Sequence, residues 1–316
     1  MKLQTFVPLE KAQQPIGYDS HILTLGSCFA EHMGNKLEYF KFQAVQNPFG
    51  ILFHPLAIEN LITRAILEEP YAKADVFFLN ERWHCFDGHS ILSDASQEIL
   101  LERLNIGLEQ IREQIKMASH MVITLGTAWV YRNKVSNKVV ANCHKVPQKE
   151  FIKELLSVDE VASSLERMIG LLRSNNTGVQ LIFTVSPVRH LKDGFVENQR
   201  SKAHLISAIH LVSGKGFVSY FPSYEIMMDE LRDYRFYGLD MVHPNELAIT
   251  YIWEKFKESW IQEAAYPIME KVEEIQRGLQ HRPFDPNSAQ HLTFLRSLEQ
   301  KMNALKQSYP FMDFGG

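Results

Sequence analysis

Short apolar runs alternate along the chain with longer segments that have helical spacing. The runs are apolar on both faces, as strands buried on both sides of a sheet are, and they span residues 21–26, 42–47, 121–126, 180–185 and 217–221. Apolar residues recur at helical intervals between them, over residues 30–39, 97–117, 158–173 and 198–212. This alternation is typical of right-handed βαβ crossovers. It predicts an α/β fold in which a parallel sheet lies between two layers of helices.

Two segments depart from this alternation. Residues 54–118 are longer than a single crossover needs and include an aromatic-rich stretch at residues 76–90, which indicates an inserted lid or substrate wall. Residues 129–145 alternate apolar and polar positions around the turn Ser136-Asn137, and this pattern predicts a β-hairpin.

The C-terminal part is helical in pattern. Residues 246–280 keep helical periodicity, residues 281–286 break it, and Ser288 is placed to N-cap a last helix that runs to about Lys306. We therefore expect an α/β domain over residues 1–260 and a helical extension over residues 261–316. The extension is expected to be a helical hairpin, which could serve to form a homodimer.

Composition and charge narrow the class of protein. Hydrophobic residues make up 45% of the chain and charged residues 22%, as in an ordinary globular protein. The formal net charge is -4 and no run of Lys or Arg could follow a phosphate backbone, so nucleic acid is not an expected partner. Residues 1–20 lack the pattern of an export signal and no long apolar stretch occurs, which predicts a cytoplasmic protein with no membrane partner.

Ser27 follows Gly26 at the end of the first predicted strand, just before a predicted helix. In an open parallel sheet, sites form outside the carboxyl ends of the strands, and a helix N-terminus favours negative charge. Ser27 is therefore a candidate nucleophile whose own N–H could donate to an oxyanion. Two alternatives remain open. Ser27 could be only an N-cap, and the adjacent Cys28 could be the nucleophile, because a helix N-terminus can lower the pKa of a thiol.

A second polar motif, Asp240-x-x-His243, lies after the last predicted strand. Three residues apart in a loop, the Asp240 carboxylate can accept a hydrogen bond from one ring nitrogen of His243 and leave the other nitrogen free to face a nucleophile. The same pair could also have only a structural role at the start of the following helix. Together with Ser27, it forms a candidate triad in the chain order Ser, Asp, His.

A family resemblance rests on several motifs of this sequence. Residues 26–30 spell Gly-Ser-Cys-Phe-Ala, and further matching motifs lie at residues 47–50, 83–86, 124–129, 186–190 and 240–243. On these motifs, over about residues 20–260, the chain resembles the GSCFA-domain family, which is similar to the SGNH (GDSL-like) hydrolases.

The resemblance implies a flavodoxin-like, three-layer α/β/α fold with five parallel strands. It also implies that Ser27 is the nucleophile of a triad with Asp240 and His243, and that the Gly50 N–H joins that of Ser27 in an oxyanion hole. No metal and no organic cofactor are required.

The sequence departs from the SGNH pattern at the third oxyanion donor. SGNH enzymes carry an asparagine after the third strand, whereas Gly126-Thr127-Ala128-Trp129 places Ala128 there. The groups that could replace this donor are the side chains of Asn47, Thr127, Trp129 and His144. Arg189 and His190 follow the fourth strand, and we expect them to border the same crevice and to bind an anionic or hydroxylated part of a substrate.

The expected function is that of a serine esterase or O-acyltransferase that acts on a small ester, such as an acetylated carbohydrate. One alternative is a catalytically weak or inactive SGNH-like module that binds carbohydrate or serves as a scaffold. A second alternative is a zinc hydrolase built on Cys28, His84-Cys85 and Cys143-His144. No C-x-x-C or H-x-x-x-H spacing supports this alternative, so no metal is expected, and the odd number of cysteines favours free thiols.

Overall fold

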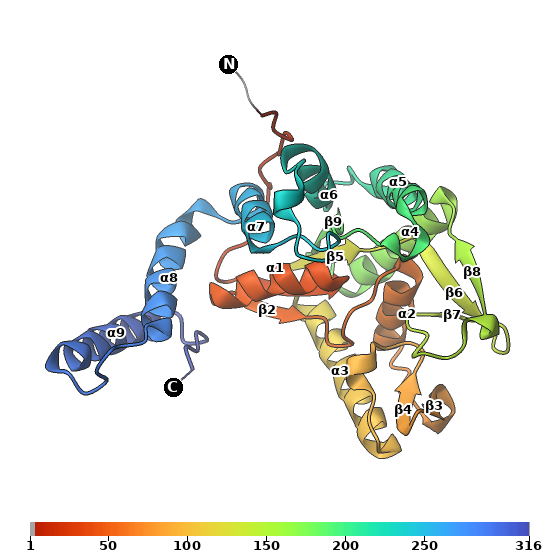
Figure 1. Ribbon diagram of the computed structural model, residues 1–316, viewed down its shortest axis with the longest axis horizontal. Helices are drawn as coiled ribbons and strands as arrows, with labels where there is room; N and C mark the ends of the chain where they lie inside the picture. Colours follow the sequence, from red (N-terminus) through yellow and green to blue (C-terminus); the bar gives the residue numbers. More distant parts are fainter. Residues whose placement is uncertain (1–3, 316) are drawn as a thin grey trace.

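The computed structural model describes residues 4–315 and has a five-stranded parallel sheet at its centre (Figure 1). The strand order is β10-β9-β5-β1-β2, which is the flavodoxin-like order of a doubly wound fold. All five predicted strands are present, as β1 (His21–Gly26), β2 (Gln43–Gln46), β5 (His120–Leu125), β9 (Gln180–Val185) and β10 (Val218–Phe221). The α/β/α prediction is confirmed.

Helices cover both faces of the sheet. On one face lie α1 (Cys28–Tyr39) and α7 (Glu246–Trp260), and on the other lie α2 (Pro55–Ile66), α3 (Gln97–Met117), α4 (Val158–Asn175) and α5 (Phe195–Val212). Neighbouring side chains of a strand point to opposite faces of the sheet, and each face is covered by one layer of helices. Ile22 packs in the cluster that contains α1 and α7, whereas Leu23 and Leu25 pack in the other. This alternation explains why the strand sequences are apolar on both faces.

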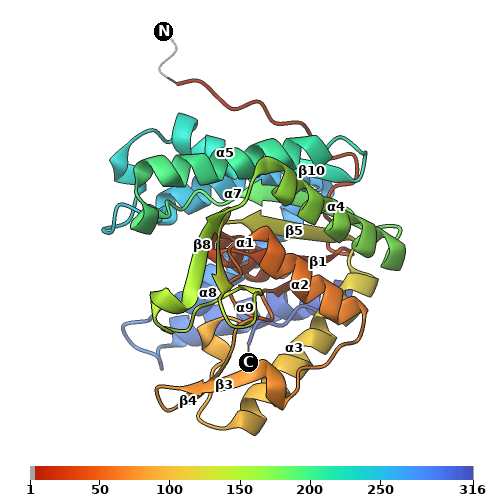
Figure 2. The same cartoon turned by 90° about the vertical axis from the view of Figure 1, so that its right-hand side faces the viewer.

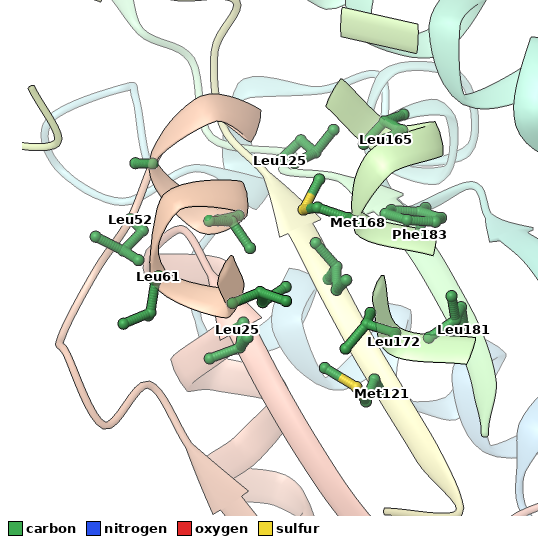
Figure 3. Close-up of a cluster of buried hydrophobic side chains, with 14 of the residues drawn as sticks. Leu25, Leu52, Leu61, Met121, Leu125, Leu165, Met168, Leu172, Leu181 and Phe183 are labelled. Carbon is green, nitrogen blue, oxygen red and sulfur yellow. The ribbon is translucent and has the colours of Figure 1, made fainter. Parts of the chain in front are cut away.

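The larger hydrophobic cluster fills the space between the sheet and the layer of α2 and α4 (Figure 3). In this view Met168 of α4 lies beside Phe183, and Leu61 lies on α2 on the side of the sheet where Leu25 and Met121 are drawn; all belong to one buried cluster. Complete burial of one such side chain contributes about 1.5–3 kcal/mol. The strands β1, β5 and β9 are therefore held in place by a closely packed core, and this core fixes the positions of their carboxyl ends.

The expected insertion is shorter than predicted. His54 N-caps α2 and Pro55 occupies its first position, so this helix starts directly after the β2 loop and packs on the sheet together with α3. The excursion is confined to the segment between α2 and α3, which carries the antiparallel hairpin of β3 (Val76–Leu79) and β4 (Arg82–Cys85). Figure 2 shows this hairpin at the lower edge of the molecule, beside α3.

The predicted hairpin after β5 is part of a larger element. β6 (Trp129–Asn133) pairs with β7 (Val139–Val140), as expected, and also with β8 (Phe151–Leu155), which the sequence analysis missed. The result is an antiparallel sheet of three strands in the order β7-β6-β8.

The C-terminal segment that was predicted as continuously helical is divided into separate helices. Residues 246–280 form two helices, α7 and α8 (Tyr266–Gln280), because Ile261 pairs with Ile16 and Pro267 restarts the helix at residue 266. Ser288 caps α9 (Ala289–Ser308), as predicted. Figure 1 shows α8 and α9 extending away from the sheet. A homodimer through this hairpin stays a prediction. Within residues 4–315, no helix is long and apolar enough to cross a bilayer.

Candidate active site

The turn between β1 and α1 is fixed by contacts to two neighbouring strands. The Gly26 N–H donates to Asn47 Oδ1 at 2.9 Å, and the Ser27 N–H donates to the Thr124 carbonyl at 3.0 Å. Gly26 has a φ of +130°, and a Cβ added there would lie 2.1 Å from the Thr124 carbonyl oxygen. Only glycine fits this close approach, so the residue sets the direction in which the chain enters α1.

Ser27 and Cys28 occupy different positions on this turn. Ser27 is the N-cap of α1, is 0% exposed, and its Oγ accepts a hydrogen bond from the Phe29 N–H at 3.3 Å. Cys28 is the first residue of the helix and is partly exposed. The helix thus begins two residues earlier than the predicted start at Ala30, and the N-cap role that the sequence left open for Ser27 is present.

Asp240 and His243 form the hydrogen-bonded pair that their spacing predicted. Asp240 Oδ2 lies 2.6 Å from His243 Nδ1, and Oδ1 accepts the backbone N–H groups of Val242 at 2.9 Å and His243 at 3.0 Å. Hydrogen bonds from the His243 and Val242 N–H groups lower the pKa of Asp240 to about 2. The carboxylate is therefore ionised at neutral pH, and it favours the His243 tautomer with the proton on Nδ1 and a free lone pair on Nε2.

His243 is within electrostatic range of α1. Burial is the main cause of the lowered pKa of His32 on this helix, and a charge on His243 lowers that pKa further. His32 is one helical turn after Cys28 and shares a face with it. Among the hydrogen bonds of residues 4–315, Ser27 Oγ accepts the Phe29 N–H and the His243 ring pairs with Asp240, so no hydrogen bond joins Ser27 to His243.

A buried lysine lies at the centre of this edge of the sheet, and the sequence analysis did not single it out. Lys202 of α5 is 1% exposed, and its Nζ donates to the carbonyls of Gly126 and Ser186 at 2.7 Å each. Burial lowers its pKa to about 7. The sequence spacing could have indicated this burial, because Lys202 shares the buried face of α5 with Asn198, Leu205 and Ile209.

The Lys202 charge reaches two further groups of the site. Burial raises the pKa of the Cys28 thiol, and the charge of Lys202 offsets only part of this rise. This charge also acts on His190, whose pKa is lowered to about 3 by burial first and then by the charges of Lys202 and His243. A Cβ added at Gly126 would lie 3.2 Å from His190 Nε2. The carboxyl ends of β1, β5 and β9 are therefore surrounded by four ionisable side chains, those of Cys28, His190, Lys202 and His243.

The two backbone N–H groups that were expected to form the oxyanion hole, those of Ser27 and Gly50, are not free to donate. The Ser27 N–H is engaged with Thr124, and the Gly50 N–H donates to the Asn47 carbonyl at 2.7 Å, so both backbone donors are already satisfied. Asn47 offers a different donor. Its side chain is 8% exposed, Oδ1 holds Gly26, and within residues 4–315 no acceptor meets its Nδ2. A buried amide without an acceptor is the strongest replacement among the predicted groups.

The other predicted donors have structural partners. Thr127 Oγ1 lies 3.0 Å from Ser201 Oγ and accepts the Trp129 N–H, and Trp129 Nε1 donates to the Glu197 carbonyl at 3.2 Å. These bonds attach β6 to α5. His144 Nε2 lies 2.6 Å from the Cys85 carbonyl, and burial lowers the pKa of His144 to about 4. His144 thus anchors the β3–β4 segment.

Arg189 borders the site through the loop of Asp240 and His243. Its N–H donates to the Val242 carbonyl at 3.2 Å, and its guanidinium lies over the rings of Tyr237 at 4.1 Å and Tyr234 at 5.3 Å. These residues line a cavity of about 130 Å³ together with Arg232 and Asp233. A cavity of this size fits a small polar group of a substrate.

Within the described range 4–315, no three His, Cys, Asp or Glu side chains are arranged to hold a metal ion. The His84 and His144 rings lie 4.8 Å apart between centroids, and each makes a hydrogen bond to a backbone carbonyl.

The fold and the site define a doubly wound α/β protein with a hydrogen-bonded Asp240–His243 pair and a buried lysine at the carboxyl edge of its sheet. A family model for the GSCFA family matches residues 21–256, and a second model, for the C-terminal domain of GSCFA domain proteins, matches residues 272–315. The chain belongs to the GSCFA family. A search of curated proteins gave no match.

Proposed function

We propose that this protein is an acyl hydrolase or O-acyltransferase that acts on a small ester, with an acetylated carbohydrate as the favoured substrate class. The observation that carries the proposal is the pair of hydrogen bonds that the Asp240 carboxylate accepts from His243, one from the ring and one from the backbone N–H. An imidazole oriented in this way by an ionised carboxylate is the general base of acyl-transfer enzymes.

The proposed reaction uses groups at the carboxyl edge of the sheet. His243 Nε2 takes a proton from a nucleophile on the Ser27–Cys28 turn, and this nucleophile attacks the ester carbonyl; the SGNH resemblance indicates Ser27. The Asn47 amide and the N-terminus of α1 stabilise the oxyanion. The leaving alcohol receives the proton from His243. Water or an acceptor alcohol then releases the acyl group with His243 again acting as the base.

Arg189 supports recognition of a polar substrate part in this proposal. Its cavity adjoins the loop that carries His243. The guanidinium lies over two tyrosine rings and is not paired with a carboxylate among residues 4–315. A guanidinium in this setting suits a carboxylate or a sugar hydroxyl.

The test is a panel of esters, from p-nitrophenyl acetate to acetylated mono- and disaccharides, with acetate release as the readout. The variants are His243→Ala and the matched control His281→Ala, whose histidine lies exposed near α9. We expect the first variant to lose activity by on the order of 10³-fold and the control to retain it. The rival function, a non-catalytic carbohydrate-binding or scaffolding module, gains support if wild type and His243→Ala release acetate equally slowly while both bind the same sugars.

A further inference from the structure

We infer that the cavity beside Arg189 is a carboxylate-binding subsite, so that the preferred substrates are esters of acidic sugars, such as acetylated hexuronic acids. The inference rests on the proposed function for the ester, whereas binding of the acid group can be measured by itself. Three features support it: the guanidinium of Arg189, the buried hydroxyl of Tyr237, and the backbone contacts that join both residues to the loop of His243.

The guanidinium of Arg189 is positioned but not neutralised. The side chain is half-buried, and within residues 4–315 no carboxylate lies within 4.0 Å of it. Its contacts are with aromatic faces, 4.1 Å from the ring centroid of Tyr237 and 5.3 Å from that of Tyr234. Stacking on the rings fixes the plane of the guanidinium and leaves N–H groups at its edge for a ligand.

Tyr237 adds a second polar group to the same cavity. The residue is 7% exposed, and among residues 4–315 its hydroxyl has no hydrogen-bond partner of normal geometry. A buried hydroxyl in this state destabilises the protein unless a ligand or a water molecule completes its bonding. A ligand oxygen in the cavity can accept hydrogen bonds from the guanidinium and from this hydroxyl.

The charge of the lining suits one carboxylate. Arg189 and the exposed Arg232 both line the cavity, whereas the carboxylate of Asp233, also in the lining, is engaged with Arg235. Asp233 lies 3.6 Å from the Arg235 side chain and accepts the Arg235 N–H at 2.9 Å. A dianion such as a phosphate would bring a second negative charge toward Asp233. The planar guanidinium also matches the two oxygens of a carboxylate.

The size and the floor of the cavity agree with this ligand. Its volume of about 130 Å³ lies below the roughly 300–1,000 Å³ of pockets that enclose a whole ligand, so it suits one functional group of a larger substrate. Met227 and Met228 of the π-helical turn η5 (Ile226–Glu230) and the adjacent Leu231 supply the apolar part of the lining. An apolar floor strengthens the attraction between a guanidinium and a carboxylate.

Backbone contacts join the cavity to the proposed general base. The Arg189 N–H donates to the Val242 carbonyl at 3.2 Å, and Tyr237 forms an antiparallel β-bridge with Pro244. The residues before and after His243 are therefore held by the two residues that would bind the acid group. A sugar whose carboxylate occupies the cavity is thereby placed beside the loop that carries the imidazole.

Binding of the acid group is tested without an ester. Isothermal titration calorimetry compares methyl glucuronoside with methyl glucoside and with methyl glucoside 6-phosphate, on wild type, Arg189→Met, Tyr237→Phe and the control Arg200→Met. Methionine keeps an apolar chain over the tyrosine rings and removes the charge. Arg200 is a matched control because it is an exposed arginine of α5 that pairs with Glu197 and does not line the cavity.

We expect wild type and Arg200→Met to bind the glucuronoside about 10- to 100-fold more tightly than the glucoside, because hydrogen bonds between charged groups are strong. Arg189→Met should lose this preference, and Tyr237→Phe should reduce it several-fold. Equal affinities of wild type for the two sugars overturn the inference even if a variant does not fold, and so does a preference that survives in Arg189→Met. Tighter binding of the phosphate than of the carboxylate also overturns it.

Acetate release from the acetylated forms of the two sugars separates this inference from the proposed function. We expect wild type to have the higher kcat/KM on the acetylated glucuronoside, by the same factor as in binding. If the carboxylate is preferred in binding but no ester is hydrolysed, the proposed function fails and the carboxylate-binding site stands. If hydrolysis depends on His243 but the acidic and neutral sugars react equally, the inference alone is wrong.

Discussion

The Asp240 carboxylate binds His243 twice, through the ring nitrogen Nδ1 at 2.6 Å and through the backbone N–H at 3.0 Å. The second bond fixes the loop and the first fixes the ring, so the imidazole is oriented by the same group that sets its tautomer. Met241, between them, has a φ of +58°, a backbone conformation that the carboxylate helps to hold.

Replacement of Asp240 tests whether the pair acts as a catalytic unit. Asp240→Asn keeps the size of the side chain and removes the charge that favours the required tautomer, so we predict a decrease in kcat of about 10²–10⁴-fold on p-nitrophenyl acetate. Asp159→Asn, an exposed change at the start of α4, is the control. Equal rates for both variants would exclude a role for the carboxylate in catalysis.

The two polar atoms of the Asn47 side chain can be separated by a single substitution. Asn47→Asp keeps the Oδ1 acceptor for Gly26 and removes the Nδ2 donor, so we predict a folded protein with kcat lowered by about 10²-fold or more. Asn47→Ala removes both and should also lower the melting temperature. Thermal unfolding followed by circular dichroism, together with ester kinetics, measures the two effects. A normal rate in Asn47→Asp would assign the asparagine to structure only.

Gly26 should be intolerant of any side chain. In Gly26→Ala the new Cβ would lie 2.1 Å from the Thr124 carbonyl oxygen at a φ of +130°, and we predict a loss of more than about 3 kcal/mol in the free energy of unfolding. In the control, Gly170→Ala within α4, nothing lies within 4 Å of the new Cβ, so stability should rise by about 0.5–1 kcal/mol. Urea titration gives both values, and equal effects at the two positions would contradict the described turn.

Lys202 predicts a specific dependence of stability on pH. Its folded-state pKa of about 7 lies below the value in the unfolded chain, near 10.5, so between these values the unfolded state binds more protons and stability rises with pH. Lys202→Met should remove this rise, and its stabilising effect relative to wild type should be largest below pH 7. Urea titrations from pH 6 to pH 10 measure the difference, and parallel curves for the two proteins would refute it.

The sequence predicted the sheet, because strands buried on both faces are recognisable from their composition. It did not predict α2 and β8. The apolar positions of α2 lie close to the aromatic-rich segment, and residues 151–155 are half exposed and pair only through β6. The Asp240–His243 bond followed from local spacing. By contrast, the hydrogen bond from the Ser27 N–H to Thr124 and the burial of Lys202 depend on contacts between elements that are far apart in the sequence, and local sequence patterns do not show such contacts.

The most direct test of the account is the pre-steady-state hydrolysis of p-nitrophenyl acetate by wild type and His243→Ala. The account predicts a burst of about one p-nitrophenol per wild-type molecule followed by slower turnover, with no burst in the variant, because only an imidazole held by Asp240 can take the proton of the nucleophile on the Ser27–Cys28 turn. Bursts of equal size and rate in the two proteins would contradict it.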